Sequence, residues 1–321
     1  MVRKALTAGF ALAGVLAGPA CAPGRAAGPP PTTAPVSTTA RAAAPTTIRA
    51  TTTSTGPAAP PYAVGSVRLA LVDPSRPTVS HGRRISASRA LTTLVWFPRR
   101  PGPWPLVVFA HGYAVGPEPY ESMLEAWATH GYVVAAPELP LDDPAVAGPN
   151  LDEADIDNLP GDLRFVTDQL VARGGTVASR IDPSRVAVAG HSDGAEAALA
   201  AAVAPPPTGQ PPYRAVLVLG GQPIPGGAGH NPPMLVVQGD ADTINPPSYG
   251  YTTWADGASP KYLLVMHGAG HLPPYQAGSR WLAGVEAATE AFFDAYLAGD
   301  RAPASVTGSV TGLATMSMRA A

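Results

Sequence analysis

One serine of this chain stands where it could act as a nucleophile. Ser192 lies in the stretch VAGHSDG, residues 188–194, with Gly190 and Gly194 two positions to either side. An apolar, β-branched run precedes it and an alanine-rich run follows, so a strand should end and a helix should begin at the serine. Such a junction lifts a serine above the edge of a sheet, at the positive end of a helix that favours developing negative charge. An ordinary N-cap serine is the competing interpretation.

A serine hydroxyl is a weak nucleophile unless a neighbouring base takes its proton. The chain has seven histidines, and two of them, His267 and His271, follow the apolar run 262–266 in the stretch HGAGHL. We favour His271 as the base, because the Gly-Ala-Gly before it gives a flexible loop that can reach across the edge of the sheet. His267 adjoins the run and is expected to be a packed or rim residue. His111 is expected to be structural.

The base in turn needs a carboxylate that fixes its tautomer and stabilises the imidazolium. Asp240 and Asp242 both follow the apolar run 234–239, in the stretch GDADTINP. Asp242 fits better within the turn from Gly239 to Pro246, and Asp240 remains the alternative. Calcium binding by these two aspartates is not indicated, because the other ligand positions of an EF-hand loop are missing.

An oxyanion hole needs two backbone N–H groups aimed at the place where negative charge develops. Asp193, directly after Ser192, is expected to supply one of them. Tyr113 follows His-Gly after the apolar run 105–110 and is expected to supply the second, with its ring available to line the acyl pocket.

Elements that would position these residues alternate along the chain. The residue pattern predicts strands over 66–72, 90–97, 105–110, 132–136, 185–190, 215–220, 234–239 and 262–266. It predicts helices over 120–131, 161–175, 195–203 and 284–299. Strands that are apolar on both faces and alternate with helices indicate a doubly wound, mostly parallel α/β sheet. No connection is long enough for a large cap domain; the longest, 137–159, could border the site. The order serine, aspartate, histidine is the one that such a serine-hydrolase sheet requires.

Five stretches of the chain resemble a known group of hydrolases. The group is that of the α/β-hydrolases that include chlorophyllases, platelet-activating-factor acetylhydrolases and cutinase-like polyester hydrolases. The resemblance is carried by the stretches VVFAHGY, WATHGYVVAAPE, VAGHSDG, VVQGDADTINP and HGAGHL. The likeness covers about 62–300 and implies the α/β-hydrolase fold and ester hydrolysis through an acyl-enzyme, without metal or cofactor. Polyester hydrolases of this group typically carry methionine after the nucleophile and a C-terminal disulfide. Asp193 and a single cysteine depart from that pattern and argue against plastic or cutin as substrate.

The N-terminal residues predict export. Arg3 and Lys4 precede an apolar run over 5–18, which is too short to span a bilayer and is followed by small residues. We therefore interpret residues 1–22 as an export signal. Cys21 resembles a lipoprotein cleavage site without the usual aliphatic residue three places earlier. Lipidation that anchors the protein to the outer face of a bacterial membrane, and cleavage near Ala22 or Ala27 with secretion, both stay open.

Composition divides the rest of the chain. Residues 23–61 are rich in Thr, Ala and Pro and have few large apolar side chains, which predicts a disordered linker. Residues 62–300 form the predicted catalytic domain and 301–321 a flexible tail. The net charge of −2, without a long basic run, argues against nucleic acid as a partner.

The sequence thus predicts an exported serine hydrolase of small-molecule or lipid-like esters. Acyl transfer or peptide cleavage with the same triad, and a non-catalytic surface protein of the same fold, are the alternatives. A cysteine-based hydrolase is excluded because the residue at the turn is Ser192.

Overall fold

The computed structural model describes residues 61–144, 146–147, 153–172, 177–228, 231–299, 306 and 312–319. The predicted export signal over 1–22, with Cys21, lies outside the described residues, and so does the predicted linker except for its last residue. In the part of the chain that is described, no helix is long and apolar enough to cross a membrane.

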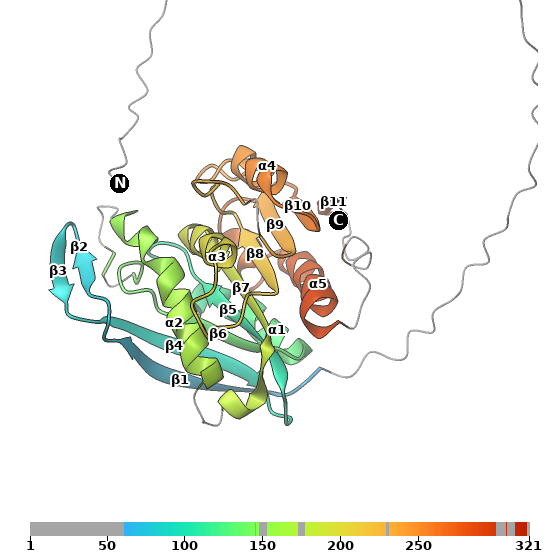
Figure 1. Ribbon diagram of the computed structural model, residues 1–321. Coiled ribbons are helices and arrows are strands. Elements are labelled where there is room, and N and C mark those ends of the chain that lie inside the picture. The colour runs from blue at the N-terminus through green and yellow to red at the C-terminus, as the bar shows by residue number, and fades with distance from the viewer. Residues whose placement is uncertain are drawn as a thin grey trace, which may run out of the picture. The chain divides into compact units, whose positions relative to one another are not determined.

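Nine strands of the described chain form one sheet (Figure 1). Their order across the sheet is β1 (Val64–Asp73), β4 (Arg89–Pro98), β6 (Val133–Pro137), β5 (Trp104–Ala110), β7 (Ile181–His191), β8 (Ala215–Leu219), β9 (Met234–Gly239), β10 (Lys261–Met266) and β11 (Ala314–Arg319). The strands from β6 to β10 run parallel, whereas β1–β4, β4–β6 and β10–β11 pair antiparallel. A small hairpin, β2 (Thr78–Ser80) with β3 (Arg83–Ser86), interrupts the connection from β1 to β4.

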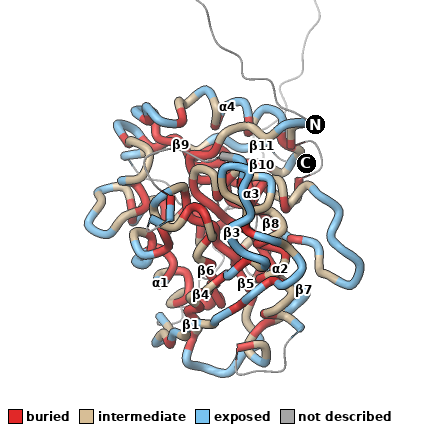
Figure 2. Tube along the Cα trace, turned by 90° about the vertical axis from the view of Figure 1, so that its left-hand side faces the viewer, coloured by how far each residue is buried: buried red, intermediate tan, exposed pale blue. Residues whose placement is uncertain are grey.

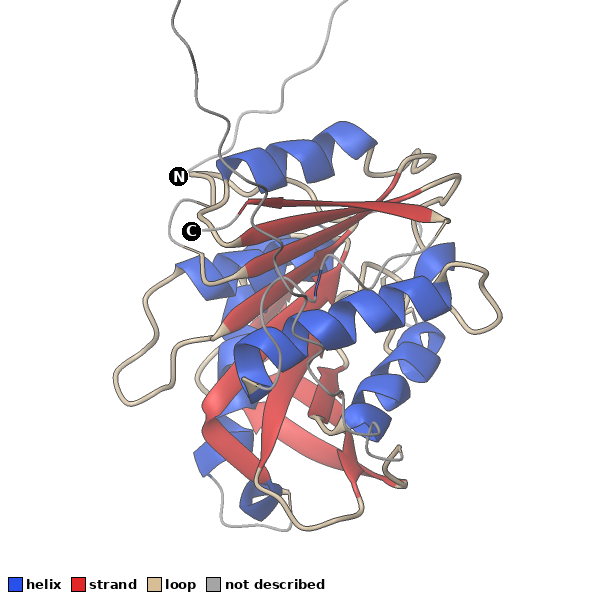
Figure 3. Cartoon of the chain, turned by 90° about the vertical axis from the view of Figure 1, so that its right-hand side faces the viewer, coloured by secondary structure: helices blue, strands red, loops and turns tan. Residues whose placement is uncertain are grey.

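Helices cover both faces of the sheet (Figure 3). On one face lie α1 (Glu121–His130) and α5 (Leu282–Phe293), and on the other lie α2 (Leu159–Ala172), α3 (Asp193–Val203) and α4 (Pro247–Asp256). Short turns of helix complete the elements: η1 (Glu118–Tyr120), η2 (Glu153–Asp157), η3 (Ala178–Arg180), η4 (Pro273–Tyr275) and the π-turn η5 (Asp294–Ala298). The predicted doubly wound, mostly parallel α/β sheet is confirmed.

The central strands are buried on both faces, as their unbroken apolar sequences require. In β5, Leu106 and Val108 pack into the layer of α2 and α3, whereas Val107 and Phe109 pack into the layer of α1 and α5. All four side chains are fully buried. Figure 2 shows that buried residues gather along the strands, between the two helical layers. The sheet is therefore a rigid platform for the loops that leave its carboxyl edge.

The centre of the sheet holds a point where the chain changes direction. From β5 the chain leads to α1 on one face, and from the neighbouring β7 it leads to α3 on the other face. Loops that leave adjacent parallel strands toward opposite faces open a crevice between them, and this is where open α/β sheets bind ligands. The loop after β5 and the turn after β7 are those that carry Tyr113 and Ser192.

The predicted flexible tail over 301–321 is wrong for its last part. Residues 314–319 form β11, which pairs with β10 along its whole length. Ala314 and Met316 pack against the layer of α5, while Thr315 between them and Ser317 after them are exposed. This alternation of inward and outward residues has the period of a strand. β11 covers the edge of β10, which would otherwise present unpaired backbone groups.

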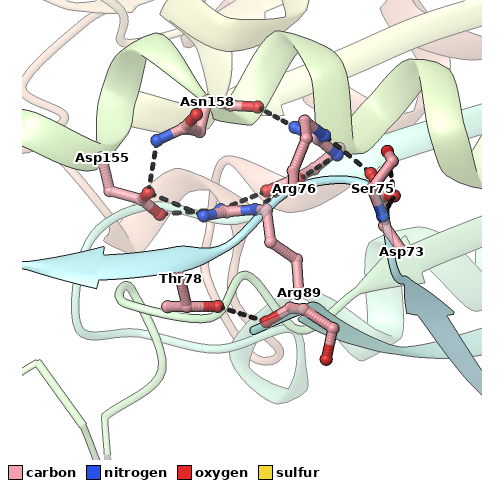
Figure 4. A network of polar contacts seen from close by, with 9 residues as sticks. Asp73, Ser75, Arg76, Thr78, Arg89, Asp155 and Asn158 are labelled. Carbon is pink, nitrogen blue, oxygen red and sulfur yellow. Dashed lines mark hydrogen bonds and ion pairs between the residues drawn. The ribbon is translucent and has the colours of Figure 1, made fainter. Parts of the chain in front are cut away.

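A buried ionic network ties the outer strands to the helical layer (Figure 4). Arg89 of β4 is fully buried and donates to both oxygens of Asp155 at 2.8 Å and to Asp162 at 2.7 and 2.5 Å. Arg76 donates to Asp162 at 2.7 Å and to Asp73 at 2.6 Å. Bidentate pairing offsets the cost of burying these charges. The network fixes η2 and the start of α2, where the long connection from β6 ends.

Candidate active site

Ser192 forms the sharp turn between β7 and α3. The strand ends at His191, the helix begins at Asp193, and the serine between them has φ 56° and ψ −125°. A residue other than glycine seldom adopts positive φ, and backbone strain of this kind gathers at functional sites. The N–H of Ser192 donates to the carbonyl of Leu219 at the end of β8, at 3.0 Å. The serine is thus held at the carboxyl edge of the central strands.

Two glycines allow the helix to cross the strands at this turn. A Cβ atom on Gly190 would lie 2.0 Å from the carbonyl oxygen of Gly194, and one on Gly194 would lie 2.3 Å from the carbonyl oxygen of Ala110. Both distances are far below any van der Waals contact, and the atoms met are backbone atoms that cannot turn away. The spacing of glycine around Ser192 is therefore a steric requirement of the turn.

His271 and Asp242 form a buried hydrogen-bonded pair. Nδ1 of the imidazole donates to Oδ2 of the carboxylate at 2.8 Å, and the side chains are only 11% and 1% exposed. Because the carboxylate accepts at Nδ1, the neutral imidazole carries its lone pair on Nε2. This is the tautomer that a general base needs.

Further donors hold the Asp242 carboxylate. The backbone N–H groups of Ile244 and Asn245 each donate to Oδ1 at 2.9 Å, and the amide of Gln238 donates to Oδ2 at 3.4 Å. Burial alone would raise the pKa of Asp242, but the hydrogen bonds from His271 and the two backbone amides outweigh it and lower the pKa below its ordinary value. The group therefore stays ionised and can stabilise an imidazolium.

The serine and the pair meet at the same place. Ser192 is bonded to the end of β8, and a Cβ on the next residue there, Gly220, would lie 3.5 Å from Nδ1 of His271 and 3.6 Å from Oδ2 of Asp242. The ring of His191, beside the serine, lies 4.5 Å from that of His271. Among the described residues, no hydrogen bond joins the serine hydroxyl to the imidazole. Catalytic hydrogen bonds are often long before substrate binds.

The loop after β5 lies against the serine. A Cβ on Gly112 would be 3.1 Å from Cβ of Ser192, and the next residue is Tyr113. The hydroxyl of Tyr113 donates to the carbonyl of Ala147, at 3.5 Å, so the ring reaches toward the connection after β6. Ala114 has a positive φ of 55°, which turns the loop sharply. The backbone of this loop, together with Asp193, borders the space above the nucleophile.

His111 holds the same loop in place. Its Nδ1 donates to the carbonyl of Gly112 at 2.9 Å, and its Nε2 accepts from the N–H of Leu139 at 3.0 Å. Burial lowers the pKa of this histidine, which favours the neutral ring that the two bonds require. Both nitrogens are occupied by backbone groups, so the structure supports the structural role expected from the sequence.

His267 pairs with the other aspartate. Its Nδ1 lies 2.9 Å from Oδ2 of Asp240, and its Nε2 bonds Thr315 of β11 at 2.8 Å. The side chains of the histidine and the aspartate are 49% and 38% exposed. The structure therefore places His267 at the rim, bonded to the edge strand.

Asp142 is a buried carboxyl near the nucleophile turn that the sequence interpretation missed. It is 3% exposed, and among the described residues its Oδ2 has no hydrogen-bond partner. Burial, followed by the negative charges of Asp193 and Asp155, raises its pKa to about 8. It is thus a neutral acid at neutral pH, and nothing in its loop sequence, LPLDDP, distinguishes it from the half-buried Asp143 that follows.

The residues that support the base were also missed. Asn245 donates from its side chain to the carbonyl of Gly220 at 2.7 Å, and Gln238 donates to the carbonyl of Asn245 at 3.0 Å. Both polar side chains are buried, and Gln238 lies within an apolar strand. A lone glutamine in a buried strand next to a candidate acid is the signal that could have identified this support.

Comparison with known protein families matches residues 67–227 to the chlorophyllase family, about half of the chain. The chain belongs to the chlorophyllase family. This membership confirms the resemblance seen in the sequence and makes the protein an α/β-hydrolase, of a family whose members act as esterases. The matched range includes Ser192 and the loop after β5, whereas Asp242 and His271 lie beyond it. No curated protein matches the chain significantly.

Proposed function

We propose that this protein hydrolyses carboxylic esters with Ser192 as nucleophile, His271 as general base and Asp242 as the acid that orients the base. The observation that carries the proposal is the buried pair of His271 and Asp242, held beside a strained serine at the carboxyl edge of the sheet. Its hydrogen bonding leaves the lone pair of the imidazole on Nε2, the nitrogen that must take a proton.

In the first step, Oγ of Ser192 attacks the ester carbonyl carbon while Nε2 of His271 takes the hydroxyl proton. The tetrahedral intermediate carries its negative charge on the former carbonyl oxygen, which the backbone N–H groups of Tyr113 and Asp193 are proposed to bind. When the intermediate collapses, the carbon–oxygen bond to the alcohol breaks, and the imidazolium gives its proton to the departing alcohol.

In the second step, water replaces the alcohol. His271 takes a proton from water, the hydroxide attacks the acyl carbon, and the proton returns to Ser192 as the acid leaves. Asp242 stays ionised throughout and stabilises the imidazolium, in keeping with its lowered pKa.

The rim of the site favours an apolar substrate. Ile244 follows Asp242 in the same turn and is 67% exposed, and Val146, in the connection next to the partner of Tyr113, is 53% exposed. Large aliphatic side chains exposed beside a polar site supply contact for an acyl chain or for a lipid-like alcohol. The proposed substrates are therefore small or lipid-like esters.

Removal of the nucleophile tests the proposal. Ser192→Ala should lower kcat on p-nitrophenyl esters, tested from acetate to palmitate, by on the order of 10⁴–10⁶ and abolish labelling by a fluorophosphonate. The matched control is Ser184→Ala, because the side chain of Ser184 bonds only its neighbour Asp182, in the exposed first part of β7 far from Ser192. Retained activity in the Ser192 variant would overturn the proposal.

An unlabelled wild-type protein would favour a non-catalytic role. Ester formation with added alcohol would identify a transferase, and cleavage in a peptide panel would identify a peptidase.

We also propose that the enzyme works outside the cytoplasm. The charged and apolar N-terminal residues described above support export, and Cys21 offers a site for lipid attachment. Cell fractionation together with metabolic labelling by an alkyne fatty acid tests this. Labelling of the wild type but not of Cys21→Ala would show an anchored lipoprotein, and unlabelled protein in the medium would show secretion.

A further inference from the structure

His191 is a fully buried histidine at the centre of the site to which the mechanism gives no part. Its Nδ1 lies 2.7 Å from the hydroxyl of Tyr120, and its Nε2 lies 3.1 Å from the backbone carbonyl of His271. Tyr120 is also fully buried, at the end of η1. A buried pair of polar side chains, one of which is bonded to the loop of the base, requires an explanation beyond packing.

The directions of these hydrogen bonds follow from the chemistry of the groups. A carbonyl only accepts, so Nε2 of His191 must carry a hydrogen. Burial first, and the neighbouring His271 second, lower the pKa of His191 to about 3, so the ring is neutral and Nδ1 is an acceptor. The hydroxyl of Tyr120 therefore donates to Nδ1, and its oxygen is left to accept from the N–H of Gly112 at 3.5 Å.

A single path of hydrogen bonds thus joins three loops. It runs from Gly112 in the loop after β5, through Tyr120, to His191 before the nucleophile, and on to the carbonyl of His271. We propose that Tyr120 and His191 are positioning residues, which fix the backbone of His271 and so hold its imidazole within reach of Ser192. This proposal rests on the proposed function, since it assigns the two side chains a part in the same reaction.

The neutral state of His191 also allows His271 to act as the base. Its ring lies 4.5 Å from that of His271 and packs between Tyr120 and Tyr275, at 5.5 and 4.9 Å. A positive charge at this distance would oppose protonation of the base, because like charges in a buried site repel strongly. With Tyr120 donating to it, His191 stays a neutral donor to the base loop.

The experiment removes one hydroxyl. Tyr120→Phe should lower kcat by on the order of 10–100-fold with KM changed by less than about 2-fold, because a misplaced base slows chemistry more than binding. Fluorophosphonate labelling of Ser192 should slow by the same factor. The matched control is Tyr275→Phe. Tyr275 is another buried tyrosine against the same ring, but its hydroxyl makes only a 3.5 Å contact with the carbonyl of Val237. Its rates should stay within about 3-fold of the wild type.

Nitrogen NMR of the histidines supplies a readout that a purely structural role would not move. In the wild type, His191 should be neutral with hydrogen on Nε2 from pH 5 to 8. In Tyr120→Phe the hydrogen should stay on Nε2, which still donates to the carbonyl of His271, but the chemical shift of Nδ1 should change because that nitrogen has lost its donor. A wild-type His191 that is charged, or that carries hydrogen on Nδ1, would overturn the proposal even where the Phe variant does not fold.

The two proposals fail in different ways. If Ser192→Ala stays active, the proposed function fails. If Ser192→Ala is inactive while Tyr120→Phe matches Tyr275→Phe in kcat, labelling rate and the Nδ1 chemical shift of His191, only the positioning role is overturned.

Discussion

Two histidine–aspartate pairs follow β9 and β10, and we propose a catalytic role for only one of them. His271 with Asp242 and His267 with Asp240 have nearly equal Nδ1–Oδ2 distances, 2.8 and 2.9 Å. Both aspartates also have pKa values below the ordinary one. In Asp240 the hydrogen bond from His267 is the main cause, and in Asp242 hydrogen bonds overcome burial. Neither the bond length nor the direction of the pKa shift distinguishes the pairs.

Burial and the second ring nitrogen do distinguish them. The side chains of His267 and Asp240 are 49% and 38% exposed, against 11% and 1% for His271 and Asp242. Nε2 of His267 bonds Thr315, whereas no described residue bonds Nε2 of His271. A carboxylate beside a histidine is therefore insufficient evidence of a triad. The base must also be shielded from water and have its other nitrogen available.

The largest expected effect comes from exchanging the two histidines in turn for glutamine. His271→Gln should lower kcat by on the order of 10⁴–10⁶, because the nucleophile loses its base. His267→Gln should change kcat by less than about 3-fold, as expected for an exposed residue outside the site. Initial rates on p-nitrophenyl butyrate measure both. Comparable losses in the two variants, or a loss in His267→Gln alone, would show that the assignment is wrong.

Asp142 is a buried carboxyl of another kind, because its Oδ2 has no hydrogen-bond partner among the described residues. The pKa of Asp142 is raised to about 8, whereas in the unfolded chain it returns to the ordinary value of 3.8. Between these values the folded protein binds a proton that the unfolded chain lacks, so the free energy of unfolding falls as the pH rises from about 4 to 8. Asp142→Asn should remove this slope and stabilise the protein at pH 8 by at least ~1 kcal/mol, since one pKa unit corresponds to ~1.4 kcal/mol.

Urea unfolding of the wild type and of Asp142→Asn at pH 5 and pH 8 measures this effect. The control is Asp182→Asn, because hydrogen bonds from Ser184 lower the pKa of Asp182 and its removal should give no stabilisation at pH 8. Equal slopes for the wild type and the Asp142 variant would contradict the raised pKa.

The smallest effect is expected at the rim pair. Thr315→Val removes the hydrogen bond to His267, and because the bond is exposed its loss should lower the free energy of unfolding by at most ~1 kcal/mol, with kcat unchanged. Ser317→Val, two residues along the same exposed strand, is the control. Thermal unfolding and initial rates are the measurements. A clear loss of kcat in the Thr315 variant alone would show that the exposed pair contributes to the site after all.

Much of the fold could be predicted because local sequence patterns determine its strands and helices. Apolar strands and amphipathic helices alternate with the periods of the elements they form, and the turn at Ser192 follows from glycine spacing. β11 was missed because its small and polar residues become a strand only by pairing with β10, about fifty residues earlier in the chain. α4 was missed because its sequence, PSYGYTTWAD, has poor helix formers, and packing of Trp254 on the core stabilises it.

The sequence indicated which residues belong to the candidate site, but not which of their side chains bond one another. Asp240 and Asp242 stand two apart in one loop, and only the fold, through Gln238 and Asn245, turns the second of them inward. His191 is a variable position of the serine motif, so its bond to the base loop has no sequence signature. Hydrogen bonds between side chains of different loops depend on the tertiary fold, which local sequence patterns do not determine.

The close crossing at Gly190 and Gly194 has a practical consequence for anyone who wishes to engineer this protein. An added Cβ atom at either position would lie less than 2.5 Å from backbone atoms, so a substitution displaces α3 from the sheet. The resulting loss of activity would come from misfolding and would say nothing about the chemistry of the site. Mutant libraries designed to change the ester specificity should therefore keep Gly190 and Gly194 unchanged. Diversity is better placed at Tyr113, Val146 and Ile244, the side chains of the proposed rim, which do not support this turn.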